Sequence, residues 1–248
     1  MIIGISGYVG NRLTGIGRVL INILSELAKQ YPEDKYVLFR NFDFKEYDNL
    51  TQYQNIEIVD VPYTKESGLK NILWHQWLFQ KLLKKYKCDI AYIPNFTLLL
   101  WKTIPTIVTI HDLIEYNVPD KFSKARMFYR KQVCDPLMAK KSNHILTVSK
   151  SSYKDIISYL GVKPSKLTLT LNATDRNVFK KYSKEKIIPA IKKYNLEYKK
   201  YLLFVGTIDF PGKNIKTIIE AFFNLRSKNE LNGIKLVIIG KNGFNSKV

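Results

Sequence analysis

The chain has 248 residues, of which 46% are hydrophobic and 13% aromatic, a composition that suits a folded globular protein and excludes long disorder. Its 40 Lys and Arg residues oppose 21 Asp and Glu residues, and the formal net charge of +19 favours polyanions such as nucleic acid, anionic lipid headgroups or phosphorylated substrates. A lysine-rich coding bias that only decorates the surface would give the same excess. No run of 18 apolar residues predicts a membrane span, and the N-terminus lacks the features of a signal peptide.

The two cysteines, Cys88 and Cys134, match no metal-binding or redox spacing. We expect them to be ordinary buried thiols, which fits a reducing cytoplasm. No Asp-x-Asp cluster occurs in the sequence, so neither a metal nor another cofactor is expected.

Short β-branched runs alternate with helical patterns through the first two thirds of the chain. Ile2–Ser6 is typical of a buried strand, and apolar residues from Ile16 to Leu27 then follow the spacing of a helix packed on a sheet. Further strands are expected at Tyr36–Arg40, Ile56–Val59, Asp89–Ile93, Thr106–Ile110, His144–Val148 and Leu167–Leu171. Further helices are expected at Leu69–Tyr86, at Lys124–Lys141 with a break or kink at Pro136, and from a cap at Ser149 to a stop at Gly161. The alternation predicts an α/β fold with a largely parallel sheet covered on both faces.

The pattern changes after residue 172. Charged residues, Pro189 and one short helical pattern mark residues 173–199 as a connection that follows a first domain at 1–172. Strand, helix and strand patterns resume at Tyr201–Val205, Ile215–Arg226 and Lys235–Ile239. The second domain would thus occupy residues 200–248, which are 49 residues where an α/β domain usually needs about 100–150. We therefore expect this domain to be a fragment, trimmed or naturally short, or to be unusually small.

Two glycine-rich arrangements follow the first strand. Gly4, Gly7 and Gly10 form G-x-x-G-x-x-G, which resembles the fingerprint of short-chain dehydrogenases and sugar epimerases. Gly15 and Gly17 lead directly into the first helix. Glycines at such a turn let backbone N–H groups face a phosphate, or they serve only the tight turn and the contact between helix and sheet.

The dinucleotide interpretation makes two further demands that the sequence meets poorly. An acidic residue should end the second strand, but Arg40 stands there. Tyr-x-x-x-Lys pairs occur at Tyr159/Lys163 and Tyr182/Lys186, away from where a nicotinamide would lie. An NAD-dependent nucleotide-sugar epimerase or reductase is therefore the second-ranked hypothesis.

Six segments together indicate a more specific resemblance. They are Thr14-Gly-Ile-Gly-Arg18, Thr109-Ile-His-Asp-Leu113, Thr147-Val-Ser-Lys-Ser-Ser152, Leu171-Asn-Ala-Thr-Asp175, the stretch from Tyr201 to Ile215, and Leu236-Val-Ile-Ile-Gly240. Their order and spacing resemble glycosyltransferase family 4, whose members have two facing Rossmann-like domains of the GT-B type, and the resemblance runs from residue 2 to about 243. It implies transfer of a sugar from a nucleotide-sugar co-substrate to a glycan or lipid-linked acceptor, with retention and without a metal, as in polysaccharide biosynthesis.

The resemblance also implies roles for individual residues. The donor diphosphate would be held by Lys213, at the start of a helix, together with Gly206 and Thr207, because its departure builds negative charge. His111, at the carboxyl end of a strand, would contact the donor sugar or the reacting centre. The remaining site residues would be Gly15, Gly17 and Arg18 in the acceptor or phosphate loop, with Asp112, Ser149 and Asn172 in support.

The sequence departs from the family pattern at several places. Thr207 stands where the family commonly has Arg, and Gly212 stands where some subgroups have Arg, so the diphosphate would meet fewer cations. The family's two glutamates seven residues apart would follow Val248, so we expect little or no transfer by this chain alone. A catalytically silent membrane- or sugar-binding remnant is the alternative outside enzymes.

Basic and aromatic residues gather in two segments, Leu69–Lys87 and Lys121–Lys141. On a helical wheel, lysines 70, 81, 84 and 85 share a sector with Trp74 and Trp77, a pattern that suits the headgroup layer of an anionic membrane. In the alternative, both tryptophans pack inside the domain. Peripheral contact with the cytoplasmic leaflet is therefore a hypothesis, whereas nucleic acid is not expected, because no zinc spacing, recognition helix or RNA-binding motif accompanies the charge.

Overall fold

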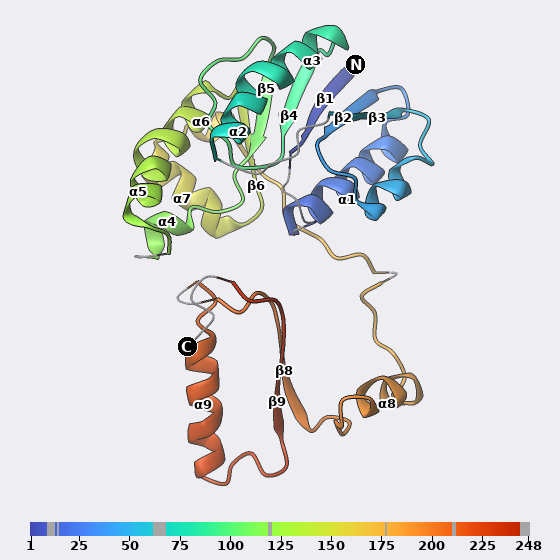
Figure 1. Ribbon diagram of the computed structural model, residues 1–248, viewed down its shortest axis with the longest axis vertical. Coiled ribbons are helices and arrows are strands. Elements are labelled where there is room, and N and C mark those ends of the chain that lie inside the picture. The colour runs from blue at the N-terminus through green and yellow to red at the C-terminus, as the bar shows by residue number, and fades with distance from the viewer. Residues whose placement is uncertain are drawn as a thin grey trace. The chain divides into compact units, whose positions relative to one another are not determined.

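The protein divides into two compact units (Figure 1). The structure, a computed structural model, describes residues 1–8, 13, 15–61, 68–118, 121–176, 178–209 and 212–243. Unit 1 consists of Met1–Asn117 and Lys124–Asn172, and unit 2 consists of Val118–Ser123 and Ala173–Val248. Within the described ranges, no helix has both the length and the hydropathy needed to cross a bilayer.

Unit 1 is built on a parallel sheet of seven described strands. They are β1 (Ile2–Gly7), β2 (Lys35–Arg40), β3 (Ile56–Asp60), β4 (Ile90–Ile93), β5 (Thr106–Thr109), β6 (His144–Thr147) and β7 (Leu167–Leu169). Their order in the sheet is β3-β2-β1-β4-β5-β6-β7, and every pairing is parallel. The predicted α/β fold with a parallel sheet is confirmed.

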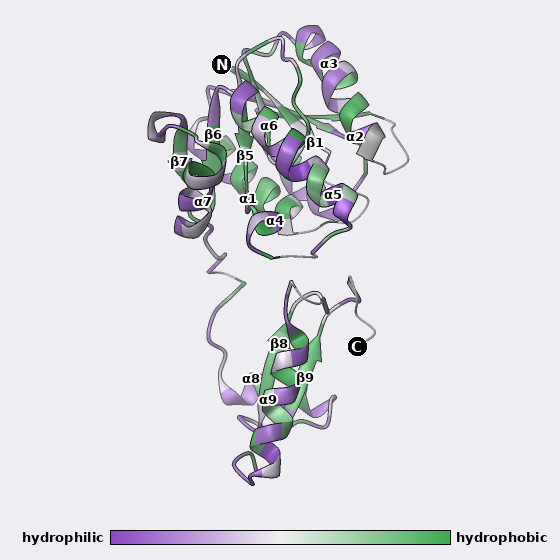
Figure 2. Ribbon diagram, turned by 90° about the vertical axis from the view of Figure 1, so that its left-hand side faces the viewer, coloured by the Kyte–Doolittle hydropathy of each residue, from purple (hydrophilic) through white to green (hydrophobic). Residues whose placement is uncertain are grey.

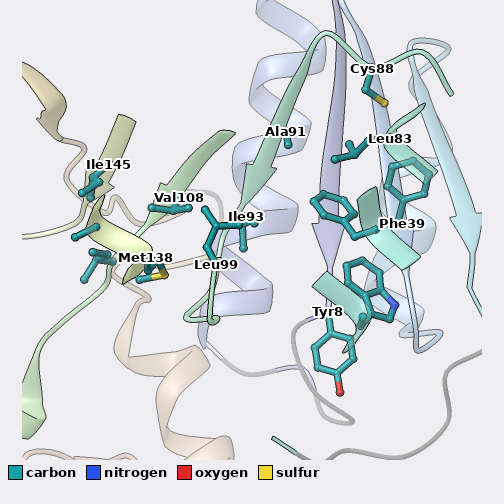
Figure 3. Packing of buried hydrophobic residues seen from close by; sticks show 14 of the residues in the cluster. Tyr8, Phe39, Leu83, Cys88, Ala91, Ile93, Leu99, Val108, Met138 and Ile145 are labelled. Atoms are coloured by element: carbon teal, nitrogen blue, oxygen red, sulfur yellow. The ribbon is translucent and has the colours of Figure 1, made fainter. Parts of the chain in front are cut away.

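Helices cover both faces of this sheet, as the alternation in β2 shows. Tyr36 and Leu38 point into a cluster with α1 (Gly15–Gln30) and the 3₁₀ helix η1 (Lys45–Leu50), whereas Val37 and Phe39 point into a second cluster on the other face. Side chains in a strand alternate between faces, so a strand that is apolar at consecutive positions must be buried on both sides. Figure 3 shows part of the second cluster, including Phe39, Leu83 and Met138.

Two of the predicted helices contain a π-helical turn. The segment predicted at Leu69–Tyr86 is α2 (Gly68–Leu73), the π turn η2 (Trp74–Leu78) and α3 (Phe79–Lys85). The segment predicted at Lys124–Lys141 is α5 (Lys124–Phe128), the π turn η3 (Tyr129–Cys134) and α6 (Asp135–Lys141). Pro136 lies in the first turn of α6, directly after η3, where its missing N–H and its ring are accommodated by the wider turn.

The predicted signals at the ends of α7 (Lys150–Leu160) are both confirmed. Ser149 is the N-cap, and its Oγ accepts a hydrogen bond from the backbone N–H of Ser152 at 3.0 Å. Gly161 is the C-cap in the left-handed region, with φ 62°. The remaining short elements of unit 1 are α4 (Ile114–Asn117) and the 3₁₀ helix η4 (Pro164–Lys166).

Unit 2 contains the strand, helix and strand predicted for the end of the chain. They are β8 (Tyr201–Val205), α9 (Ile215–Ser227) and β9 (Lys235–Ile239), preceded by α8 (Lys184–Lys192) with Pro189 inside it. β8 and β9 pair in parallel, and Figure 2 shows both as apolar ribbons beside α9. Ile215 and Phe222 are the buried residues of α9.

Candidate functional site

The sheet of unit 1 reverses its direction of strand addition between β1 and β4. Strands β2 and β3 continue to one side of β1, and β4 to β7 continue to the other. In open parallel sheets, ligands bind outside the carboxyl ends of the strands at such a reversal. The segments that follow β1, β4, β5 and β6 therefore define the candidate site in this unit, and His111, Asp112 and Ser149 all lie in them.

His111 follows β5 and is fixed by contacts with two neighbouring segments. Its Nε2–H donates to the carbonyl oxygen of Pro94, which follows β4, at 3.0 Å. A carbonyl only accepts, so this bond sets the tautomer and leaves Nδ1 as the acceptor of the neutral ring. Among the described residues, Nδ1 has no hydrogen-bond partner. The ring is half-buried, so that nitrogen is the group His111 can offer to a substrate.

A chain of hydroxyl groups connects His111 with the predicted supporting residue Ser149. Ser152 Oγ donates to the backbone oxygen of His111 at 2.8 Å, and Ser149 Oγ donates to Ser152 Oγ at 2.9 Å. Thr147 Oγ1 adds a bond to the backbone oxygen of Ile110 at 2.8 Å. The helix cap of α7 and the loop of His111 are thus one hydrogen-bonded assembly, and Ser152 is the member that the sequence pattern missed.

A buried group of charged side chains lies directly behind the His111 loop. Glu115 on α4 accepts a hydrogen bond from Nε of Arg130 at 2.8 Å, and the Arg130 guanidinium lies 3.8 Å from the centre of the Phe96 ring. Asp135 is fully buried, and burial first, then the neighbouring Glu115 carboxyl group, raise the pKa of Asp135 to about 9. Asp135 therefore keeps its proton at neutral pH, so it adds no second negative charge beside Glu115, which pairs with Arg130. Asp112 itself is exposed, and its Oδ1 accepts from the Ile114 N–H at 3.3 Å.

The end of β1 is held by a buried histidine. Ser6 Oγ lies 2.9 Å from His75 Nε2, and His75 Nδ1 lies 2.9 Å from the backbone oxygen of Asn71. The oxygen of Asn71 can only accept, so Nδ1 carries the proton and Nε2 accepts from Ser6. Burial lowers the pKa of His75 to about 4, so the ring is neutral and acts as a structural link between α2, η2 and β1.

Packing explains the described glycines of the G-x-x-G-x-x-G arrangement. A Cβ on Gly7 would lie 2.8 Å from the carbonyl oxygen of Phe39, and a Cβ on Gly4 would overlap the side chains of Leu83 and Cys88. Gly10 and Thr14 lie outside the described residues. Arg40, at the end of β2, forms ion pairs with Asp60 and Asp43, both at 2.6 Å. Gly4 and Gly7 thus serve close packing in the sheet and against its helix, and Arg40 serves ion pairs.

The other predicted residues of unit 1 stand at the ends of elements. Gly15 is the first residue of α1 and is exposed, with open space where a side chain would lie. Gly17 is buried in the same turn, and Arg18 is exposed. Asn172 is exposed and is the last residue of unit 1, so no described contact joins it to the His111 loop.

Unit 2 places Gly206, Thr207 and Lys213 between β8 and α9. The N–H of Gly206 donates to the backbone oxygen of Ile239 at 2.9 Å. Gly206 therefore has no free amide for a ligand, although the lack of a side chain lets a ligand come close to its backbone. Lys213 is exposed, directly before the start of α9. The N-cap Asn214 makes no side-chain bond to the helix N–H groups, and the first turn holds no acid. The start of α9 therefore presents N–H groups and the ammonium groups of Lys213 and Lys216 to solvent.

A buried ion pair lies next to this loop. Lys121 Nζ donates to Asp209 Oδ2, and only 11% of each side chain is exposed. A side chain added at Gly212 would collide with the Lys121 ammonium group. Some subgroups of the resembled family carry Arg at the position of Gly212. Here the Lys121 ammonium group, paired with Asp209, occupies the adjoining space, so a cation is still present.

The remaining features of the described residues are the cysteines, the acidic and histidine side chains, and one cavity. Both cysteines are buried free thiols, and burial raises the pKa of Cys88 to about 11 and that of Cys134 to about 12. In the part of the chain that is described, no three His, Cys, Asp or Glu side chains gather as metal ligands. A cavity of about 730 Å³ between α6, α7 and η4 lies at the amino ends of β6 and β7, away from His111.

The prediction that Trp74 and Trp77 both face a membrane is wrong for Trp74. Trp74 is fully buried and stacks on Phe79 at 5.1 Å, whereas Trp77 is 57% exposed. The helical wheel assumed 3.6 residues per turn, but both residues lie in the π turn η2, where successive side chains rotate by a smaller angle. Residues three apart therefore diverge more than they do in an α-helix. Trp77 pairs with Trp101 instead, with ring centres 5.7 Å apart.

Comparisons with known proteins agree with this geometry. The O-antigen chain mannosyltransferase B of Escherichia coli is 26% identical over 95% of the chain and 63% of its own length. The glycosyltransferase WaaG, which is involved in lipopolysaccharide biosynthesis, has a TM-score of 0.69 at 14% identity, over 98% of the chain and 64% of WaaG. The UDP-GlcNAc 2-epimerase of Neisseria meningitidis, bound to UDP-GlcNAc, has a TM-score of 0.57 at 13% identity, over 96% of the chain and 65% of the epimerase.

These likenesses confirm the predicted fold class. The chain spans less than two thirds of the length of each of these three proteins. The two structures are too distant in sequence to show more than the fold. The sequence profile of Glycosyltransferase Family 4 matches residues 13–178, which is more than half of the chain and includes the His111 loop and the cap of α7. The chain therefore belongs to glycosyltransferase family 4.

Proposed function

We propose that the protein transfers a hexose from a nucleotide-sugar donor to a glycan or lipid-linked acceptor, with retention at the anomeric carbon. The observation that carries the proposal is His111, held at the carboxyl edge of a parallel sheet within the segment that matches the family profile. The relative from E. coli, a mannosyltransferase, supports a hexose as the transferred group.

The proposal divides the substrates between the two units. We assign the donor diphosphate to unit 2, because Lys213 and the uncapped start of α9 offer positive charge and N–H dipoles. Departure of a nucleoside diphosphate leaves negative charge on its oxygen atoms, and groups fixed in advance stabilise that charge without reorganisation. A neighbouring fold that binds UDP-GlcNAc, that of the epimerase, is consistent with this assignment.

We assign the acceptor and the reacting carbon to unit 1. His111 contributes Nδ1 as an acceptor, since Nε2 is committed to Pro94. The start of α1 has two residues without side chains, Gly15 and Gly17, and one cationic side chain, Arg18, which together would receive the acceptor. Orientation is the main contribution of such groups, because correctly held reactants avoid much of the entropic barrier.

We further propose that the protein works in the cytoplasm at the inner face of an anionic membrane. The two buried free thiols support a reducing compartment. The net charge of +19 supports an anionic surface as the second partner. A lipid-linked acceptor would present its sugar at such a surface.

Calorimetric titration of the full chain tests the donor assignment. The titrants are hexoses linked to UDP, GDP, ADP or dTDP, the free nucleoside diphosphates, and NAD⁺. We expect one nucleotide class to bind, with competition by its free diphosphate, and we expect no heat from NAD⁺. Binding of NAD⁺ in place of every sugar nucleotide would favour the epimerase or reductase and contradict the proposal.

A further inference from the structure

Four large apolar side chains form an exposed surface on unit 1, here named the Trp77 patch. They are Leu73, Trp77, Leu100 and Trp101, with exposed fractions of 41%, 57%, 44% and 44%. The two indole rings meet edge to face at 5.7 Å and 74°. Isolated apolar residues on a surface need no explanation, but a cluster with two tryptophans marks a binding surface.

Buried hydrogen bonds hold this patch in place. Gln76 Oε1 accepts from the N–H groups of Leu100 and Trp101 at 2.9 and 3.1 Å, and Gln76 Nε2 donates to the oxygen of Leu98 at 2.9 Å. Gln80 Oε1 accepts from the N–H and hydroxyl of Thr103, both at 3.0 Å. Both glutamines are almost completely buried. The loop after β4 is thus fixed along η2 and α3, and the exposure of Trp101 is built into the fold.

The surroundings of the patch are basic. Residues 69–87 contain five lysines and no acidic residue, and residues 96–105 contain Lys102 and no acidic residue. Lys81 follows Trp77 by one helical turn and is exposed. Tryptophan prefers the interface between water and lipid, and lysines near it add attraction to anionic headgroups.

We propose that the Trp77 patch is the surface through which the protein docks on an anionic lipid bilayer, with Trp77 and Trp101 entering the headgroup layer. An acidic protein partner would explain the lysines but would not require two exposed indole rings beside them. The inference rests on the proposed membrane location and not on the chemistry of sugar transfer.

Co-sedimentation with vesicles of phosphatidylcholine alone, or with added phosphatidylglycerol, tests this surface. The double variant Trp77→Ala/Trp101→Ala should bind anionic vesicles at least about tenfold more weakly, because it loses two large apolar contacts. Its remaining tryptophan, Trp74, is buried, so a blue emission maximum that moves to the red only on unfolding shows that the fold is intact. The matched control Phe128→Ala/Phe179→Ala removes two exposed aromatics elsewhere and should bind like the wild type.

Wild-type binding should also shift tryptophan emission to the blue and weaken with added salt. Equal binding of the double variant and the wild type, or equal binding to both kinds of vesicle, would overturn the proposal. So would self-association of the wild type without lipid that the double variant abolishes while vesicle binding persists. Nucleotide titration of the double variant separates the two proposals, since donor binding should be unchanged.

Discussion

The buried carboxyl pair of Glu115 and Asp135 predicts an unusual dependence of stability on pH. Both carboxyl groups are almost completely buried, and the ion pair of this group joins Arg130 to Glu115 and not to Asp135. The groups that face Asp135 from neighbouring segments are Glu115, Asp112, Tyr116, Tyr129, Arg130 and Cys134. Removing the ability of Asp135 to ionise, by Asp135→Asn, tests whether this site needs a proton.

The size of the effect follows from the two pKa values. The pKa of Asp135 is about 9 in the folded protein, and an aspartate in an unfolded chain has a pKa of about 3.9. Between these values the folded state holds one proton that the unfolded state has released, so this group makes the protein less stable as the pH rises. The free energy of unfolding should therefore fall as the pH rises from 6 to 8, by on the order of 1 kcal/mol per pH unit from this group.

Urea unfolding followed by tryptophan fluorescence measures this contribution. All three tryptophans lie in unit 1, so their emission reports the unit that contains Asp135. The side chain of Asp135→Asn does not ionise at any pH, so the variant should lose most of the pH dependence and gain stability relative to the wild type at pH 8. Asp48→Asn, which changes an exposed carboxylate in the same unit, should leave the slope unchanged. Parallel curves for wild type and Asp135→Asn would refute the assignment of a buried proton.

Three further outcomes are expected. Lys213→Ala should weaken binding of a nucleoside diphosphate at least about tenfold in calorimetric titration. Lys228→Ala, which removes a lysine at the other end of α9, should leave this affinity unchanged, and equal losses in the two variants would argue against a specific role for Lys213. Ser149→Ala should lower the free energy of unfolding by about 1 kcal/mol. Ser149→Asp should restore it, because a carboxylate oxygen caps α7 as the serine hydroxyl does, and an unchanged stability in Ser149→Ala would contradict this role. Gly161→Ala should destabilise unit 1 by about 1 kcal/mol through the φ of 62° alone, since a Cβ there meets open space, and an unchanged urea midpoint would disprove the strain.

Local signals in the sequence were sufficient for most of the fold of unit 1. β-branched runs and helical spacing predict each strand within one or two residues, because burial on both faces leaves a continuous apolar pattern. The cap at Ser149 and the stop at Gly161 were also readable, since each depends on a single residue and its own backbone. The π turn η2 was not readable, because its wider turn arises from packing that a regular wheel ignores, and the burial of Trp74 was missed with it.

The candidate site was predictable only in part. His111 and Ser149 were found from their positions after strands, but Pro94 carries no motif, and Ser152 belongs to a family-like segment that gave it no role. The same is true of Glu115 and Asp135, which are 20 residues apart in sequence and come together because α4 packs against η3, which continues into α6. Contacts of this kind depend on tertiary structure, so periodicity and spacing do not reveal them.

Hydrogen–deuterium exchange of the full chain, with and without a saturating sugar nucleotide, tests the donor assignment most directly. The proposed function predicts slower exchange for the amides between Gly206 and the first turn of α9, around Lys213, where the diphosphate would bind. Slower exchange confined to the end of β1, from Ile5 to Tyr8, with no change around Lys213, would place the ligand at the dinucleotide-like glycines and contradict the assignment.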